Sequence, residues 1–360
     1  MLDESLRNFK HIDFAKDLLD WFSKNKRDLP WRRTKNPYYI WISEIMLQQT
    51  KVDTVIRYYD NFTERYPTPE ALAKAEEQDV LKQWEGLGYY SRARNLHTAV
   101  KEVVEKYEGE VPKDPKKLEK LKGIGPYTKG AIMSIAFNEP EPAVDGNVMR
   151  VLARILAIND NIMEQKTRRR FERIVRTIIH KDEPGNFNEA LMELGALVCI
   201  PRSPRCSKCP VKTYCQAYKE NKQQELPVRL RKTKQTKKEY LTFLLFNEKG
   251  HIAIEQRPSK GLLANMWQFP MIDKKSIKGK TATEIFAKRY GLPIEIKRKL
   301  GEATHQFSHK AWTLTAYEAT VLKDELEKDM LQFVSITELK GYPISVAHQK
   351  VQSLSDKFSN

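Results

Sequence analysis

The four cysteines of this chain lie close together, and that arrangement limits how the region around them can fold. They occur between positions 199 and 215, with six, two and five residues separating successive members: Cys199, Cys206, Cys209 and Cys215. Scattered cysteines would suggest core packing or disulfides, whereas this spacing lets four soft thiolates converge on one metal or iron–sulfur centre. The backbone of residues 199–215 must therefore wrap around a single point.

The charge balance points to a polyanionic partner. The 360 residues include 63 Lys and Arg against 47 Asp and Glu, a formal net charge of +16. Such an excess attracts polyanions over long range, so nucleic acid is the first partner to consider and an anionic membrane the alternative. The sequence has no run of about 20 apolar residues, and its opening segment carries acids where a signal peptide has an apolar core. We therefore expect a cytoplasmic protein without membrane contact, whose thiols stay reduced.

A basic segment divides the chain into two parts of different character. Residues 219–238, KENKQQELPVRLRKTKQTKK, show almost no periodic apolar signal and are typical of a solvated linker. Before this segment, apolar residues recur at helical spacing, which predicts an all-α domain over residues 1–218. After it the pattern changes to short apolar runs, and residues 239–360 are predicted to form an α+β domain.

The second domain is expected to begin with a β-hairpin. Apolar runs at residues 240–246 and 251–256 flank the turn Asn-Glu-Lys-Gly. A further strand is expected at residues 312–321, with helices at residues 282–290 and 345–354.

A glycine hairpin in the first domain is a candidate phosphate site. The segment LKGIGPYT places Gly123 and Gly125 between a short helix and a second helix that begins at Pro126. The glycines permit backbone angles closed to other residues, and the exposed N–H groups beside a helix amino terminus attract phosphate. An ordinary helix corner is the alternative. A basic collar favours phosphate, because a plain corner does not need one; it consists of Lys113, Lys116, Lys117, Lys120, Lys122 and Lys129.

Several motifs together resemble a known family. LKGIGPYT, VDGNVMRVLARI and the cysteine array are similar to the helix-hairpin-helix glycosylase superfamily, whose endonuclease III branch carries a four-iron four-sulfur (4Fe-4S) cluster. WISEIMLQQT, GLGYYSRARNL and FNEALMELGALVC resemble the adenine DNA glycosylase (MutY) family within it. The match covers residues 14–215 and resumes at GLLANMWQFP and HQFSH. The resemblance implies a monomeric base excision repair enzyme that flips out and hydrolyses adenine opposite 8-oxoguanine or guanine in duplex DNA.

The expected architecture is then a multidomain chain. An all-α helix-hairpin-helix glycosylase domain with an iron–sulfur loop precedes an α+β MutT-like (Nudix) domain. Four cysteines could also hold zinc, but zinc sites usually show paired knuckles or include His, and the nearest histidines lie outside residues 199–215. The 4Fe-4S cluster is expected to be positional, holding residues 201–205 against the DNA backbone.

Two carboxylates are candidates for the chemistry. Glu44 lies in an apolar helical segment, where poor solvation would raise its pKa and suit a general acid; a helix amino-terminal acid near Ser43 is the alternative. Asp145 precedes a predicted helix, and capping that helix would lower its pKa and keep it charged. By resemblance, Glu44 protonates the base, Asp145 stabilises the oxocarbenium-like sugar and Asn147 orients Asp145.

Tyr127 decides between two types of enzyme in this superfamily. In members that form a Schiff base and also nick DNA, a lysine follows the second hairpin glycine by two residues. Here Tyr127 occupies that position, and a phenol cannot form an imine. A monofunctional glycosylase is therefore predicted.

The resemblance also supplies candidates for the contacts to DNA. Reaching a base in a duplex requires extruding it from the stack. Gln49 and Tyr89 are expected to enter the helix, with Gln48 and Tyr90 as one-position alternatives in the paired motifs. Without the motif they would be surface amides and core aromatics. The residues expected to line the adenine pocket are Trp31, Arg32 and Glu189.

The second domain is expected to read DNA rather than hydrolyse nucleotides. Nudix hydrolysis needs a glutamate-rich helix to hold divalent metal, and the corresponding segment lacks paired glutamates. By resemblance, Phe307, Ser308 and His309 recognise 8-oxoguanine; a plain turn is the alternative. Two other functions stay open: a glycosylase of the same fold acting on thymine or uracil opposite guanine, and a DNA-binding protein without enzyme activity.

Overall fold

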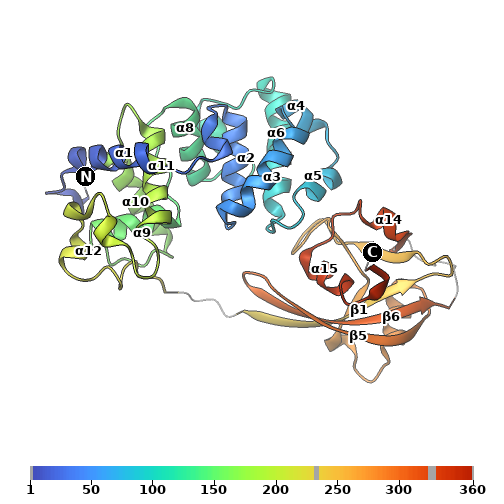
Figure 1. Cartoon of the computed structure of the whole chain (residues 1–360). Helices are drawn as coiled ribbons and strands as arrows, with labels where there is room; N and C mark the ends of the chain where they lie inside the picture. The colour runs from blue at the N-terminus through green and yellow to red at the C-terminus, as the bar shows by residue number, and fades with distance from the viewer. Residues whose placement is uncertain (1–2, 231–234, 323–329, 359–360) are drawn as a thin grey trace. The chain divides into compact units, whose positions relative to one another are not determined.

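The computed structural model describes residues 3–230, 235–322 and 330–358, and the chain forms two compact units. One comprises Met1–Lys74 and Thr98–Lys232, and the other comprises Ala75–His97 and Thr233–Asn360. This grouping differs from the predicted division, because residues 75–97 cluster with the carboxy-terminal part of the chain. Each unit is drawn in Figure 1.

The first unit is helical, as predicted. Its core is formed by the apolar faces of several helices, and α11 packs against α1, α8 and α9. The helices of this unit are α1 (His11–Asn25), α2 (Pro37–Leu47), α3 (Val52–Arg65), α4 (Pro69–Lys74), α7 (Pro115–Lys120), α8 (Pro126–Phe137), α9 (Gly146–Ile155), α10 (Gln165–Ile178), α11 (Pro184–Leu197) and α12 (Gln216–Lys219). Helix α6 (Ser91–Tyr107) begins in the second unit, and α5 (Glu77–Gln83) lies wholly within it.

The glycine hairpin connects α7 to α8, as expected. Gly123 has a φ of +85°, the left-handed region that favours glycine. Gly125 instead has an extended φ of −94° and caps α8, with Pro126 at the first helical position. Only one of the two glycines therefore uses a conformation that is closed to other residues. A Cβ at Gly125 would meet no atom within 4 Å, so its missing side chain leaves open space in front of the helix terminus.

The predicted linker is wrong over its first half. Leu226 is buried in the core of the first unit, and its carbonyl accepts a hydrogen bond of 2.9 Å from Arg154 Nε. The Val228 carbonyl accepts another, of 3.0 Å, from the Ile162 N–H. These few apolar residues dock the segment in spite of its charge. Strand β1 already begins at Thr236, and the part of the predicted linker at residues 231–234 lies outside the described residues.

The second unit contains a mixed seven-stranded sheet. Its main strand order is β3-β2-β1-β6-β5, with β4 paired to β1 and β7 paired to β2; β1 and β6 are parallel. The strands are β1 (Thr236–Phe246), β2 (Ile252–Gln256), β3 (Trp267–Gln268), β4 (Met271–Asp273), β5 (Ile294–Gln306), β6 (Lys310–Val321) and β7 (Gln332–Val334). The β1–β2 pairing and the position of β6 confirm the predicted hairpin and strand.

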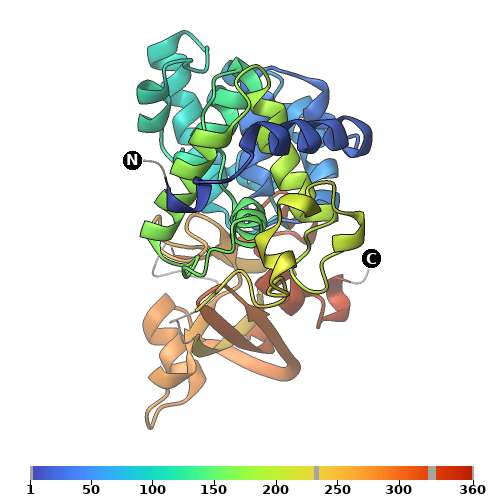
Figure 2. The same cartoon turned by 90° about the vertical axis from the view of Figure 1, so that its left-hand side faces the viewer.

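Helices cover both faces of this sheet. Phe286 and Tyr290 of α13 (Ala282–Tyr290) pack into one core cluster, and Ala347 and Val351 of α15 (Val346–Gln352) pack into the other. Figure 2 shows α13 on one side of the strands and the red carboxy-terminal helices on the other. Helix α14 (Ile336–Leu339) also belongs to this unit. Both helices expected in this domain are confirmed.

Residues 75–97 belong to the second unit because hydrogen bonds hold them there. Trp267 Nε1 donates to Gln78 Oε1 over 3.1 Å, and Arg94 Nη1 donates to the Ala264 carbonyl over 2.7 Å. Glu85 accepts from the Ile344 N–H at 2.8 Å. Across the described parts of both units, no helix is long and apolar enough to cross a membrane.

Candidate active site

Glu44 is a buried carboxylate on the second half of α2. Glu44 is 5% exposed. The hydroxyl of Tyr127, near the start of α8, donates a 2.5 Å hydrogen bond to Glu44 Oε2. The same hydroxyl lies 3.4 Å from Met192 Sδ on α11. Because α2 begins at Pro37, the alternative of a helix amino-terminal acid does not apply to Glu44.

The surroundings of Glu44 favour its protonated form. Burial, helped by the nearby charges of Glu189 and Asp145, raises its pKa to about 7 in spite of the hydrogen bond from Tyr127, which lowers it. The predicted direction is confirmed. Burial and the charge of Glu44 raise the pKa of Tyr127 well above its usual value, so its phenol stays protonated and able to donate.

Asp145 caps α9, as predicted. Its Oδ1 accepts from the Val148 N–H at 2.7 Å, and its Oδ2 accepts from Asn147 Nδ2 at 2.8 Å. The predicted pKa direction is wrong, however. Burial raises the pKa of Asp145 more than the hydrogen bonds from Val148 and Asn147 lower it. The cap was visible in the sequence, whereas the surrounding helices that exclude water were not.

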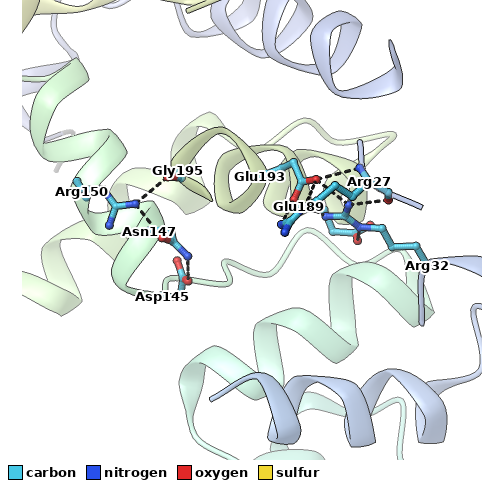
Figure 3. Close-up of polar contacts among 8 residues, drawn as sticks. All are labelled: Arg27, Arg32, Asp145, Asn147, Arg150, Glu189, Glu193 and Gly195. Carbon is cyan, nitrogen blue, oxygen red and sulfur yellow. Dashed lines mark hydrogen bonds and ion pairs between the residues drawn. The ribbon is translucent and has the colours of Figure 1, made fainter. Parts of the chain in front are cut away.

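A chain of hydrogen bonds leads from Asp145 through Asn147 to Arg150, as Figure 3 shows, and from Arg150 on to the cysteine segment. Asn147 Oδ1 accepts from Arg150 Nη2 at 2.8 Å, and the same nitrogen donates to the Gly195 carbonyl at 2.8 Å. Arg150 Nε donates to the Cys199 carbonyl at 2.8 Å. Arg150 was not singled out in the sequence. Its signal was a cation three residues after Asn147 on a helix whose other residues are mostly apolar.

Asn188 on α11 fixes the loop that leads to Asp145. Its side chain is fully buried, and its Nδ2 donates to Ser134 Oγ and to the Glu141 carbonyl, each at 2.9 Å. Its Oδ1 accepts from the Ala143 N–H at 3.2 Å. Asn188 therefore replaces the backbone partners that this irregular loop lacks.

All four cysteines line one cavity of the first unit. Arg154 of α9 is 2% exposed and organises the segment that follows Cys199, because it donates to the Ile200 carbonyl at 2.8 Å and the Pro201 carbonyl at 3.0 Å. Among the described residues, no three His, Cys, Asp or Glu side chains are placed to share one metal ion. Four thiols around one cavity can serve one shared centre, either a multi-iron cluster, where each thiolate binds a different iron, or a zinc ion.

The three predicted pocket residues lie together only in part. Arg32 Nε donates to Glu189 Oε1 at 2.8 Å, so these two are in direct contact. Trp31 is buried and packs edge-on against Tyr59, with 5.4 Å between ring centroids. Arg32 also meets Glu193, which was not singled out, although its spacing of four residues from Glu189 indicated a shared helix face.

The paired amides and tyrosines differ in exposure. In the first unit, Gln48 is half-buried and donates to Thr128 Oγ1 at 3.2 Å, whereas Gln49 is exposed with a φ of +61°. In the second unit, Tyr90 is buried and accepts from the Gly86 N–H at 3.2 Å, whereas Tyr89 is 48% exposed. Of each pair, Gln49 and Tyr89 are thus the residues presented to solvent.

Residues 307–309 form the turn between β5 and β6. Ser308 Oγ lies 2.9 Å from the Tyr89 hydroxyl, and Phe307 packs edge-on against Trp312 with centroids 5.0 Å apart. Phe307, Ser308 and His309 line a cavity of about 730 Å³ within the second unit. On α13, the Glu284 carboxylate accepts from the Thr281 N–H at 2.6 Å and so caps its own helix.

Comparisons with known proteins agree with both units. Residues 42–177 match the family described as HhH-GPD superfamily base excision DNA repair protein, and residues 241–354 match the NUDIX domain family. The chain is 37% identical to the adenine DNA glycosylase of Arabidopsis thaliana over 81% of its own length and 54% of that protein. It is 36% identical to the adenine DNA glycosylase of Buchnera aphidicola subsp. Schizaphis graminum, over 82% and 84% of the two chains.

A solved structure supports the helical fold. The structure of a thermostable thymine-DNA glycosylase aligns with a TM-score of 0.54 and 31% identity, covering 59% of this chain and 97% of that one.

Proposed function

Because this chain belongs to the adenine DNA glycosylase family, we propose that it hydrolyses the N-glycosidic bond of adenine in duplex DNA. The substrate is adenine opposite 8-oxoguanine or guanine, and the reaction is a step of base excision repair. One observation carries the proposal: Glu44, with a pKa of about 7, lies beside Tyr127 and close enough to Asp145 to sense its charge.

Glu44 is the proposed proton donor. At neutral pH a large fraction of Glu44 carries a proton, which it transfers to N7 of the adenine. The electrons of the glycosidic bond then leave with the protonated base, and positive charge develops at C1′ of the sugar. Water adds to C1′ and gives its proton to Glu44, which restores the acid for the next turnover.

Asp145 is the proposed stabiliser of the sugar cation. Positive charge at C1′ favours the ionised carboxylate, which offsets the burial that raises its pKa in the free protein. Asn147 fixes the orientation of this carboxylate through its 2.8 Å hydrogen bond. Tyr127 offers no amine for a Schiff base, so the product is an uncut abasic site.

The cysteines are proposed to hold a 4Fe-4S cluster. The cavity that they share supports one common centre, and membership of the adenine DNA glycosylase family favours the 4Fe-4S cluster over a single zinc ion. A bound cluster would crosslink residues 199–215 and would supply no proton or electron to base release. Arg150 donates hydrogen bonds to both the Cys199 carbonyl and Asn147. It would thereby connect the fixed cysteine segment to Asn147 and Asp145.

DNA contacts are proposed for both units. Gly123, Gly125 and the exposed Lys122 would grip phosphate, and Gln49 and Tyr89 would enter the duplex beside the mispair. In the second unit, residues 307–309 would read 8-oxoguanine.

The likeness to a thymine-DNA glycosylase favours a second candidate, removal of thymine opposite guanine. The acidity of Glu44 argues against removal of thymine. Adenine has a basic N7 that a neutral carboxylic acid can protonate, whereas thymine has no comparable ring nitrogen. The pKa of Glu44 therefore suits a purine leaving group.

A base-release assay tests the proposal. Duplexes carrying adenine opposite 8-oxoguanine, and thymine or uracil opposite guanine, are incubated with the protein and analysed with and without alkali. We expect release of adenine only, and strand breaks only after alkali. Preferential release of thymine or uracil, or efficient strand cleavage without alkali, would contradict the proposal.

Two variants test the carboxylates. Glu44→Gln and Asp145→Asn should each lower the single-turnover rate of adenine release by at least about 1,000-fold, because each removes a group that acts on the reacting atoms. Binding to the same duplex, measured by fluorescence anisotropy, should stay close to wild type. Activity retained by either variant would refute the role given to that residue.

A further inference from the structure

Helix α11 presents a second carboxylate beside the proposed adenine pocket. Glu189, Met192 and Glu193 follow one another at helical spacing and share one face of α11. Met192 contacts Tyr127, and Glu189 contacts Arg32. Glu193 therefore lies among the proposed site residues, and its hydrogen bonds go to Arg27 and Arg32 rather than to Glu44 or Asp145.

Two arginines hold the carboxylate of Glu193 (Figure 3). The residue is 1% exposed and accepts five hydrogen bonds. Arg27 donates from its backbone N–H and Nε to Oε1, both at 2.9 Å, and from Nη2 to Oε2 at 2.7 Å. Arg32 donates from Nη1 and Nη2, both at 3.1 Å. Burial acts to raise the pKa of Glu193, but the hydrogen bonds from the arginines outweigh it and lower the pKa to about 2.

These contacts occupy both terminal nitrogens of the Arg32 guanidinium, Nη1 and Nη2. Both Nη atoms point to Glu193, Nη1 also donates to the Arg27 carbonyl at 3.1 Å, and the guanidinium stacks on Phe22 with 5.2 Å to the ring centroid. Only Nε is left for Glu189, which it reaches at Oε1. Among the described residues, no other hydrogen bond to Glu189 is formed, so Oε2 keeps its acceptor capacity.

A carboxylate oxygen with spare acceptor capacity matches one edge of adenine. The 6-amino group of adenine is a donor, whereas guanine and hypoxanthine present a carbonyl oxygen there, which a carboxylate repels. If Glu193 were absent, Arg32 could turn its fork onto Glu189 and occupy both oxygens, because arginine and carboxylate prefer two parallel hydrogen bonds.

We propose that Glu193, held by Arg27, is a positioning residue for adenine selection. It binds Nη1 and Nη2 of Arg32 and so keeps them away from Glu189. One Glu189 oxygen therefore stays available for the 6-amino group of adenine. This inference rests on the proposed function. A purely structural role would be the alternative, but a buried ion pair is a poor source of stability compared with apolar packing.

The test compares two leaving bases. Single-turnover release is measured opposite 8-oxoguanine for adenine and for purine, which lacks the 6-amino group. Glu193→Gln should slow adenine release roughly 10-fold more than purine release, because it releases Arg32 to Glu189 and removes one polar contact to adenine. Asp28→Asn is the matched control: Asp28 adjoins Arg27 and pairs with Arg33, but both side chains are exposed. The control should leave both rates unchanged.

A second variant keeps the test valid if Glu193→Gln folds poorly. Arg27→Gln removes the half-buried partner and leaves the buried pair of Glu193 and Arg32, so the same loss of preference for adenine over purine should appear at about 3-fold. Equal slowing of both bases in the folded variants would overturn the positioning role alone. Failure of the wild-type protein to release adenine would overturn the proposed function, and this inference with it.

Discussion

Glu44 is held between its two protonation states by opposing influences at a single position. Burial and neighbouring carboxylates favour the acid, while the Tyr127 hydroxyl donates to the carboxylate and favours the base. A group that must give a proton to a leaving base and later accept one from water needs a pKa near the working pH. The cost is a carboxyl group placed where water cannot stabilise its charge.

The pH dependence of base release should follow the protonation of Glu44. Because the acid form is the donor, the single-turnover rate should fall as pH rises through about 7, by nearly tenfold per unit above it. Tyr127→Phe removes the hydrogen bond that lowers this pKa, so the falling limb should move to higher pH. Rates measured between about pH 5 and pH 9 decide the matter, and a limb that stays in place or moves down would contradict the assignment.

Glu44→Gln should make the protein more stable above neutral pH. The folded state binds a proton at Glu44 up to about pH 7, whereas the unfolded chain releases it near 4.5, so wild-type stability is lost as pH rises across this window. The variant lacks that loss and should gain on the order of 1–3 kcal/mol at pH 8, with little difference at pH 4. Urea unfolding at the two pH values measures it, and equal stability at pH 8 would argue against a raised pKa.

The roles of single residues were predictable where they depend on near neighbours in the chain. Glu44 stands in an apolar segment, and Asp145 directly precedes a helix, so the raised pKa of the first and the cap of the second could be read from the sequence. The raised pKa of Asp145 could not, because burial depends on helices distant in the chain. Arg150 and Glu193 were missed because their partners lie far along the sequence.

At the scale of elements, the two glycines of the α7–α8 hairpin serve different purposes. Gly123 needs glycine for its own backbone angle, whereas Gly125 has ordinary angles and open space before it. The sequence pattern predicted the hairpin and both flanking helices but did not distinguish the two glycines, because φ is set by how the turn closes. Apolar periodicity similarly located most helices and strands but not the docking of Leu226.

Alanine substitutions should separate these uses. Gly123→Ala should lower the free energy of unfolding by about 1–2 kcal/mol, because it forces a side chain into the left-handed region. Gly125→Ala should leave thermal stability close to wild type and weaken binding to duplex DNA by roughly 10-fold, because a Cβ would stand where phosphate approaches. Thermal melts and anisotropy titrations at fixed salt measure both. Unchanged DNA affinity in Gly125→Ala would remove the hairpin from the proposed contacts.

At the scale of the whole chain, the sequence indicated two parts but not how the polypeptide is shared between them. Residues 75–97 are helical like their neighbours, and nothing in their periodicity assigns them to the carboxy-terminal unit. Hydrogen bonds such as those of Gln78 and Arg94 decide it, and their partners lie far along the chain. Within that unit, Tyr89 and Ser308 are brought to hydrogen-bonding distance.

The second unit should contribute selectivity rather than catalysis. Removal of the residues after position 232, just before β1, should leave some adenine release while lowering the preference for 8-oxoguanine over guanine by roughly 10-fold. Ser308→Ala is the milder variant and should lower the preference by about 3–10-fold, the worth of one hydrogen bond. The preference is the ratio of the adenine release rates measured opposite 8-oxoguanine and opposite guanine. An unchanged ratio in both variants would contradict the proposed role of the second unit.

The buried Asn188 has a consequence for interpreting variants of this protein. It makes two hydrogen bonds to the loop before Asp145 and one to Ser134 on α8, and none of the three reaches either proposed catalytic carboxylate. Replacing it with an apolar residue would orphan those polar groups and free the loop. A survey that ranks substitutions by distance from the reacting atoms would score this position as harmless and would leave a loss of activity caused there unexplained.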